Sequence, residues 1–223
     1  MPGVMDLQHR LVIFDLDGTL VNSLGDLAAS MNAVLGSLGY PQHPTAPYRR
    51  FVGDGIAMLV RRALPPEVTD DALVERCIGL MRAEYARRQT DTTVPYPGIP
   101  ALLATLAGQS RLTAVLSNKP DGPTRELVRA LLAPHRFDAV RGARPDTPLK
   151  PDPAAALEIA AQLGVEQDRA AFVGDTNIDM QTARNAGMTA VGVTWGFRDA
   201  DELRASGAHH IIDRPAELLE RLG

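Results

Sequence analysis

Two carboxylates stand at the end of one apolar run near the start of the chain. Residues 11–21 read L-V-I-F-D-L-D-G-T-L-V, so Asp15 closes the apolar run and Asp17 follows two positions later. A short apolar run that ends at a turn is typical of a strand buried on both faces, and Gly18 supplies the turn. Two acids in one crevice repel each other unless a cation or a proton relieves them. The pattern therefore favours a metal site with a nucleophilic or proton-transferring Asp over a solvated turn.

The lysines form a second group with chemical potential. Of the 23 lysine and arginine residues, only Lys119 and Lys150 are lysine. Both stand in short segments beside proline, at 117–120 (S-N-K-P) and 149–153 (L-K-P-D-P). The lysine ammonium is a compact point charge, which suits neutralisation of a phosphate or a carboxylate better than the planar guanidinium does. The strong preference for arginine elsewhere in the chain therefore favours a functional role for both lysines over the alternative that they are surface residues without a role.

Apolar runs and helical patterns alternate along most of the chain. Runs with the character of buried strands lie at 11–14, 112–116, 170–173, 189–193 and 210–212. Helical patterns fill 99–106, 123–132, 153–163, 178–186 and 216–222, and no strand is expected between residue 14 and about residue 110. Strands that alternate with helices of this length indicate an α/β fold, with a Rossmann-like parallel sheet and helices on both faces.

The segment from residue 22 to residue 94 departs from this alternation, because its apolar residues follow helical spacing alone. Three stripes recur at this spacing: Leu27, Met31, Val34, Leu35 and Leu38; Ile56, Leu59, Val60 and Ala63; and Val74, Ile78, Met81 and Tyr85. A helical block of about seventy residues is too long for a simple crossover between strands. The sequence therefore predicts a core of residues 1–21 and 95–223, with an inserted all-α cap of residues 22–94.

Polar residues follow several of the predicted strands at the point where each strand ends. They comprise Asp15 and Asp17, then Ser117, Asn118 and Lys119, and finally Asp175 and Asp179, while Lys150 stands in a loop before the helix expected near Pro153. Ligands of open parallel sheets bind outside the carboxyl ends of the strands. Four polar clusters on one edge of one sheet are hard to explain as ordinary solvent-exposed residues, so we predict a catalytic site there.

These motifs resemble those of the haloacid dehalogenase-like phosphatase superfamily, in the branch that carries an α-helical cap after the first motif. The resemblance runs almost from end to end and includes all four superfamily motifs. Within the superfamily the chain is most similar to the phosphoglycolate phosphatase group. The segments that carry this similarity are 15–21, 52–55, 95–98, 117–120, 150–153, 172–175 and 193–197.

The resemblance implies roles for the acids and for Lys150. Asp15 would attack phosphorus and form an aspartyl-phosphate, which splits one hard displacement into two easier ones. Asp17 would protonate the leaving alkoxide and later take a proton from the attacking water. Lys150 would neutralise Asp15 and the charge that develops on the phosphoryl group.

The resemblance also implies a Mg²⁺ cofactor, a hard cation suited to oxygen ligands. Its ligands would be Asp15, the backbone carbonyl of Asp17 and Asp175, while Asp179 would hold a metal-bound water or Lys150. Ser117 and the backbone N–H that follows it would bind the phosphoryl oxygens, beside Asn118.

Several polar residues keep two interpretations each. Thr19 either helps to set Asp17 or serves as a turn hydroxyl, and Lys119 either lines the substrate entrance or faces solvent. The segment Gly53-Asp54-Gly55 either reaches the substrate from the cap or forms the turn that starts the next helix. The five histidines match no ligand spacing and are expected at the solvated surface.

The implied activity is Mg²⁺-dependent hydrolysis of a small phosphate monoester, with 2-phosphoglycolate as the first candidate. Ser117 replaces a threonine common in that group, and residues 144–149 also differ from its pattern, which leaves the substrate open. The alternatives are a pyrophosphatase, a nucleotidase or a sugar phosphatase, and in another class a non-catalytic binding protein on the same scaffold. A binding protein has no need of a nucleophile together with an acid.

Composition sets outer bounds on these interpretations. With 223 residues, 45% hydrophobic residues and a net charge of −4, the chain can bury a sizeable core and lacks the basic excess of nucleic-acid binders. Its single cysteine allows no intramolecular disulfide. We expect no secretory leader, and no apolar run approaches the ~18 residues of a membrane span. We therefore expect a cytoplasmic monomer or homodimer whose partner is a small phosphorylated metabolite.

Overall fold

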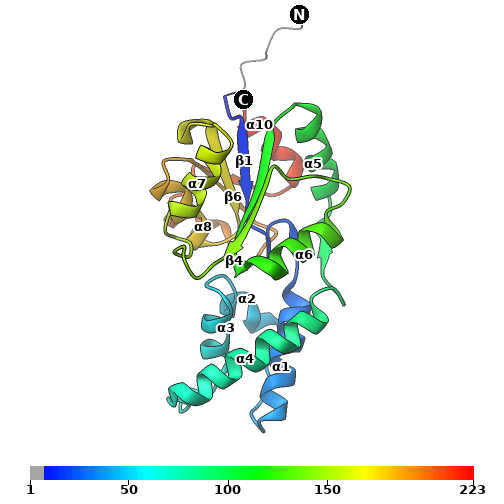
Figure 1. Cartoon of the computed structure of the whole chain (residues 1–223), viewed down its shortest axis with the longest axis vertical. Coiled ribbons are helices and arrows are strands. Elements are labelled where there is room, and N and C mark those ends of the chain that lie inside the picture. The colour runs from blue at the N-terminus through cyan, green and yellow to red at the C-terminus, as the bar shows by residue number, and fades with distance from the viewer. Residues whose placement is uncertain (1–7) are drawn as a thin grey trace, which may run out of the picture.

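Six parallel strands form the central sheet of residues 8–223, the part of the chain that the computed structural model describes (Figure 1). Residues 1–7, on which the expectation of no leader partly rests, lie outside this part. The strands run in the order β5-β4-β1-β6-β7-β8, and every neighbouring pair is parallel. Their bounds are β1 Leu11–Phe14, β4 Leu112–Pro120, β5 Ala139–Ala143, β6 Ala170–Gly174, β7 Thr189–Val193 and β8 His210–Ile212. The predicted parallel α/β sheet is confirmed, whereas β5 was not predicted.

Helices cover both faces of this sheet because alternate residues of each strand point to opposite sides. In β1, Val12 and Phe14 join the apolar cluster of one face, and Leu11 and Ile13 join that of the other. The first face packs against α5 Ile99–Gly108, α6 Asp121–Leu131 and α10 Leu218–Arg221. The second packs against α7 Ala154–Gln162, α8 Asn177–Asn185 and α9 Ala200–Ala205. Each fully buried side chain of this size stabilises the fold by about 2 kcal/mol.

Four helices lie between β2 and β3, and we call them the helical insertion (Figure 1). They are α1 Leu24–Ser37, α2 Thr45–Phe51, α3 Ile56–Ala63 and α4 Asp71–Arg88. The three predicted stripes do form an apolar cluster of their own, separate from the two clusters at the sheet. Within residues 8–223, no helix combines the length and apolarity that a membrane crossing requires.

Two very short strands join the helical insertion to the core, which corrects the expectation of no strand between residue 14 and about residue 110. β2 Val21–Asn22 and β3 Val94–Pro95 pair antiparallel. Runs of two residues are too short to carry a periodic pattern. Beside them the buried carboxylate of Asp26 accepts hydrogen bonds from the backbone N–H and the hydroxyl of both Thr92 and Thr93, at 2.5–3.1 Å. The start of α1 is thereby tied to the returning chain.

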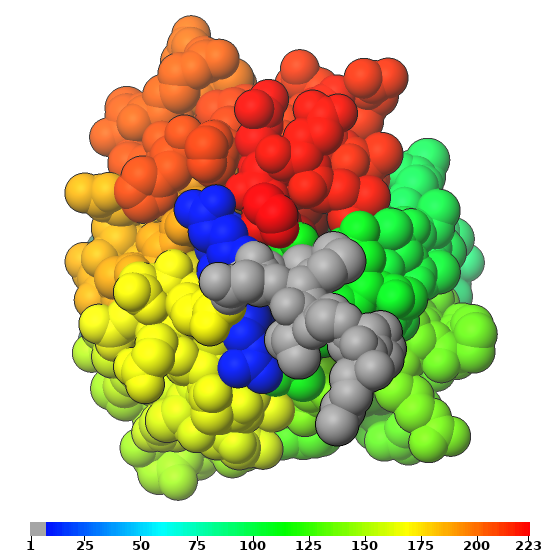
Figure 2. Space-filling view, turned by 90° about the horizontal axis from the view of Figure 1, so that it is seen from above, coloured from blue at the N-terminus to red at the C-terminus, as the bar shows by residue number. Residues whose placement is uncertain are grey.

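The first described residues lie against the carboxyl-terminal segment, on the end of the molecule away from the helical insertion (Figure 2). His9 is buried there, with Nδ1 2.9 Å from the carbonyl oxygen of Leu222 and Nε2 2.8 Å from the Thr189 hydroxyl. The expectation of a solvated surface is therefore wrong for His9. Its partners come from distant parts of the chain, so no local pattern reveals them.

Candidate active site

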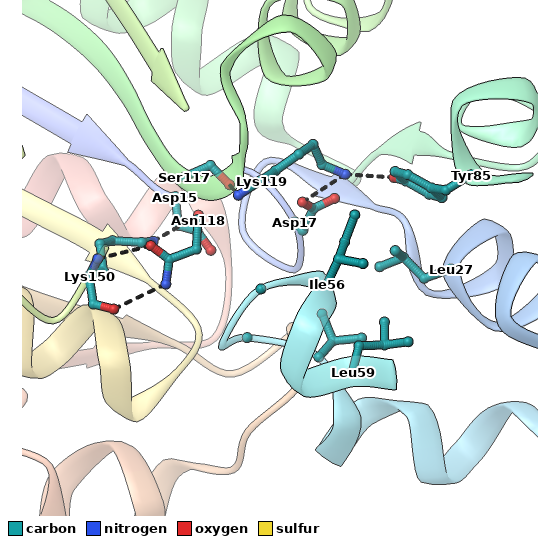
Figure 3. Close-up of a pocket in the computed structure, with 13 residues that line it drawn as sticks. Asp15, Asp17, Leu27, Ile56, Leu59, Tyr85, Ser117, Asn118, Lys119 and Lys150 are labelled. Atoms are coloured by element: carbon teal, nitrogen blue, oxygen red, sulfur yellow. Dashed lines mark hydrogen bonds and ion pairs between the residues drawn. The ribbon is translucent and has the colours of Figure 1, made fainter. Parts of the chain in front are cut away.

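A cavity of about 50 Å³ lies where the carboxyl ends of the strands face the helical insertion (Figure 3). The core contributes the polar part of its lining and the helical insertion most of the apolar part. The lining residues are Asp15, Asp17, Ser117, Asn118, Lys119 and Lys150 from the core, and Leu27, Val52, Gly53, Gly55, Ile56, Leu59 and Tyr85 from the insertion. Residues separated by more than a hundred positions thus meet in one small space.

Lys150 bridges two of the predicted acids. Its Nζ lies 2.9 Å from Oδ1 of Asp15 and 2.6 Å from Oδ1 of Asp179, and all three side chains are buried. Burial raises the pKa of Asp15 to about 7. Lys150 lowers this pKa, but it offsets only part of the rise, to which the charges of Asp179 and Asp17 also contribute. Burial would lower the pKa of Lys150, but the two carboxylates outweigh it and raise that pKa. The lysine is therefore held as an ammonium.

The position of Lys150 is fixed from two sides. The Asn118 amide donates to the Lys150 carbonyl oxygen at 3.1 Å and accepts from the Lys150 N–H at 2.9 Å. The second oxygen of Asp179 accepts from the N–H and the hydroxyl of Thr176, which caps the start of α8. Asn118, which the sequence predicts as a phosphate contact, thus holds the lysine loop.

Asp175 is fully buried and receives two hydrogen bonds from the core. The Thr19 hydroxyl donates to its Oδ1 at 3.0 Å, and the Phe197 N–H donates to its Oδ2 at 2.8 Å. Thr19 therefore orients Asp175. This role differs from both predictions for Thr19, which were that it sets Asp17 or serves as a turn hydroxyl. Burial raises the pKa of Asp175 well above its ordinary value, and the nearby Asp179 and Asp15 add to the rise.

Asp15, Asp175 and Asp179 each offer a carboxylate oxygen within 4.8 Å of the others. An all-oxygen donor set with several negative charges fits a hard divalent cation. Burial first, and the neighbouring acids second, raise the pKa of Asp15 and of Asp175, so a cation in this cluster would stabilise the ionised carboxylates. The Asp17 carboxylate does not belong to this cluster.

At Gly18, whose φ is +90°, a Cβ would come within 2.3 Å of Asp175, so the turn demands glycine.

Asp17 faces a second lysine. Nζ of Lys119 lies 3.0 Å from Oδ2 of Asp17 and 2.6 Å from the Tyr85 hydroxyl, which it donates to (Figure 3). Lys119 is 7% exposed and lines the cavity, which decides between its two interpretations. Oδ1 of Asp17 is buried and has no hydrogen-bond partner among residues 8–223. That oxygen therefore keeps an unused capacity for hydrogen bonding.

Tyr85 joins the site although the sequence indicates only an apolar stripe of α4 for it. Its ring does pack in the cluster of the helical insertion, but its hydroxyl reaches Lys119. Nothing local to α4 predicts this contact, since it depends on how the insertion sits over the core.

The loop between α2 and α3 contributes glycines but no acid. Gly53 and Gly55 line the cavity. The Asp54 carboxylate instead accepts from Arg62 at 2.5 Å, so the structure does not bring this predicted residue to the cavity. Gly55 stands at the cap position of α3 and offers it no side chain.

The loop after β7 connects the acids to the helical insertion and was not predicted to do so. The Phe197 side chain is buried in the apolar cluster of the insertion, while its N–H serves Asp175. The neighbouring Arg198 donates to the Val52 carbonyl oxygen at 2.9 Å. Contact with the helical insertion and placement of Asp175 therefore depend on one loop.

Comparisons with known proteins agree with this architecture. A phosphoglycolate phosphatase from Pseudomonas putida is 37% identical over 98% of this chain and 80% of its own length. One from Rhodospirillum rubrum is 36% identical over 96% of this chain and 91% of its own length. The crystal structure of a predicted phosphoglycolate phosphatase from Haemophilus somnus superposes with a TM-score of 0.89 at 30% identity, covering 97% of this chain and 99% of that one. The family model for haloacid dehalogenase-like hydrolases matches residues 12–193, and the chain belongs to that family, as its motifs predict.

Proposed function

We propose that this chain is a Mg²⁺-dependent phosphatase that hydrolyses a small phosphate monoester, 2-phosphoglycolate, through an aspartyl-phosphate. The observation that carries the proposal is the placement of Asp15 and Asp17 in the lining of one cavity, each with its own buried lysine. A binding protein would not need two differently partnered acids. The relatives from Pseudomonas putida and Rhodospirillum rubrum are named phosphoglycolate phosphatases, which supports the choice of substrate.

Asp15 is the proposed nucleophile. Its ammonium partner Lys150 lowers the cost of bringing a phosphate dianion beside a carboxylate, and later neutralises charge on the phosphoryl oxygens. Asp15, the Asp17 carbonyl and Asp175 would bind Mg²⁺, and Asp179 would support this set from its outer side. The ion would supply positive charge for the phosphoryl oxygens and keep Asp15 ionised. Asp179 holds Lys150 at its working position.

Asp17 is the proposed acid and base. Lys119 pairs with Oδ2 of Asp17, and the unpaired Oδ1 is the oxygen proposed to donate a proton to the leaving alkoxide. In the second step the same oxygen takes a proton from the water that attacks the aspartyl-phosphate.

Ser117 and the backbone after it are the proposed contacts of the phosphoryl oxygens. The Ser117 hydroxyl lies in the cavity lining and accepts a 3.2 Å hydrogen bond from the Lys119 N–H, which keeps it at the end of β4. Asn118 acts indirectly through its two hydrogen bonds with Lys150.

The proposed cap is residues 22–94, which comprise the helical insertion and the segments that link it to the core. The proposed core is residues 1–21 and 95–223. The side chains of the cap complete the cavity, and closure would expel bulk water from the reacting groups. The short β2–β3 pair is the natural hinge for this motion.

A direct assay tests the proposal. Purified protein should hydrolyse 2-phosphoglycolate and p-nitrophenyl phosphate with Mg²⁺, stop in EDTA, and lose activity in Asp15→Asn. Equal activity of wild type and Asp15→Asn would refute the nucleophile and with it the mechanism. A panel with pyrophosphate, nucleoside monophosphates and sugar phosphates, compared by kcat/KM, separates the competing phosphohydrolase activities.

A further inference from the structure

We propose that Lys119 and Tyr85 together recognise a carboxylate on the leaving group, so that the enzyme selects short phosphorylated hydroxy acids. The inference rests on the proposed phosphatase function and names what the far end of the same cavity is built to bind. Lys119 comes from the end of β4 and Tyr85 from α4, so the pair exists only where core and helical insertion meet.

The placement of the pair defines which part of a substrate it meets. Asp15 and Lys150 lie toward one end of the cavity, and Lys119 and Tyr85 toward the other, with Asp17 beside Lys119 (Figure 3). A phosphate at Asp15 directs its ester oxygen toward Asp17. Atoms of the leaving group beyond that oxygen then approach the Lys119 ammonium, 3.0 Å from the Asp17 carboxylate.

The pair retains two donors for a ligand. An ammonium has three N–H donors, and Lys119 uses two of them on Asp17 and Tyr85. The Tyr85 hydroxyl accepts from Lys119, which leaves its own proton free to donate. Burial raises the pKa of Tyr85 to about 12, more than Lys119 lowers it, so the hydroxyl keeps that proton. Two donors side by side match the two oxygens of a carboxylate.

The remaining wall at this end excludes other classes of leaving group. Leu27, Ile56 and Leu59 form the apolar surface beside the pair, and they offer nothing to the hydroxyls of a sugar. The cavity is small, at about 50 Å³, which favours a short leaving group over a nucleoside. A second phosphate, as in pyrophosphate, would press an extra charged oxygen against these apolar side chains. A carboxylate within two or three bonds of the ester oxygen can accept hydrogen bonds from Lys119 and Tyr85 without placing a polar group against the apolar side chains.

The experiment compares two substrates that differ in this group alone. Ethyl phosphate has the leaving group of 2-phosphoglycolate with a methyl in place of the carboxylate. Wild type should prefer 2-phosphoglycolate by at least about 100-fold in kcat/KM, because ethyl phosphate leaves buried donors unpaired. In Lys119→Met this ratio should fall close to 1, and in Tyr85→Phe it should fall about tenfold. Arg129→Met, which removes an exposed charge from α6, serves as the matched control and should keep the wild-type ratio.

Binding provides a readout that does not require turnover. Titration of 2-phosphoglycolate into Asp15→Asn should give an affinity about 100-fold higher than titration into Asp15→Asn/Lys119→Met, with thermal melts to verify that both variants fold. If Lys119→Met lowers kcat/KM equally for both esters, Lys119 acts on Asp17 and the carboxylate proposal is overturned. Faster turnover of pyrophosphate than of 2-phosphoglycolate would also overturn it. Hydrolysis of neither ester by wild type would instead remove the proposed function itself.

Discussion

Phe197 joins Asp175 to the helical insertion through opposite ends of one residue. Its N–H donates to Oδ2 of Asp175 at 2.8 Å, and its ring is buried among side chains of α1–α4. Any movement of the insertion that shifts this ring therefore also shifts a hydrogen bond to a proposed metal ligand. Opening of the cavity and loosening of the acidic cluster are expected to occur together.

Truncation of this ring should weaken both functions of the loop. Phe197→Ala removes buried packing and should destabilise the fold by about 3 kcal/mol, with a severalfold weaker apparent Mg²⁺ affinity. Denaturant unfolding and calorimetric titration of Mg²⁺ measure the two effects. Phe197→Leu, which retains most of the apolar volume, is the matched control. A loss of stability with unchanged Mg²⁺ affinity would mean that the ring does not influence Asp175.

Loss of the Lys150 charge should be costly mainly when the acids are ionised. Lys150→Met leaves Asp15 and Asp179 facing each other without a cation, and breaking such a buried pair costs about 3–5 kcal/mol. We expect this penalty in unfolding experiments at pH 8 with EDTA. At pH 5 it should shrink, because Asp15, whose pKa already lies at about 7 in the intact site, then holds a proton. An equal penalty at both pH values would contradict the electrostatic explanation.

Metal binding should release protons in a defined pH range. The pKa of Asp15 is raised in the folded protein to about 7, so the metal-free fold retains a proton that the unfolded chain loses above its ordinary value of 3.8. This group therefore lowers the stability of the metal-free protein progressively as pH rises from about 4 to 7. Bound Mg²⁺ needs the ionised carboxylate, so its apparent affinity should fall below pH 7. Calorimetry in buffers of different ionisation enthalpy should detect proton release at pH 6 and much less at pH 9, whereas equal release would refute the assignment.

Asp26 should stabilise the junction between the insertion and the core. Burial would raise its pKa, but the hydrogen bonds from Thr92 and Thr93 outweigh burial and lower it. A lowered carboxylate pKa contributes stability that is present above the unfolded value near 4 and is lost as pH falls through the folded value. Asp26→Asn should therefore destabilise the protein by about 2 kcal/mol at pH 7 and by less near pH 3. Urea unfolding at the two pH values measures the difference, and Asp91→Asn, an exposed neighbour, is a suitable control.

The sequence predicted which core residues lie together at this edge of the sheet, because these residues are attached to strong local patterns. Asp15, Ser117 and Asp175 follow apolar runs, and parallel strands bring their carboxyl ends to one edge. The strand β5 was missed because its A-V-R-G-A sequence is half-buried and neither alternates nor forms an apolar run.

The contacts that complete the site could not be predicted, since they join segments with no shared pattern. Tyr85 looks like one more apolar position of α4 until the insertion is placed over Lys119. Phe197 acts through its backbone N–H, which any residue possesses. Asp54 has the type and position of a substrate contact, but Arg62 on the next helix takes its carboxylate. In each case the partner, rather than the residue, decides the role.

Both lysines of this chain are buried in the active-site cavity, and their pKa values are raised. Amine-directed reagents react with unprotonated, accessible amines, so neither lysine side chain should react while the cavity keeps this form. A label that enters a lysine side chain would in turn report that the cavity had opened.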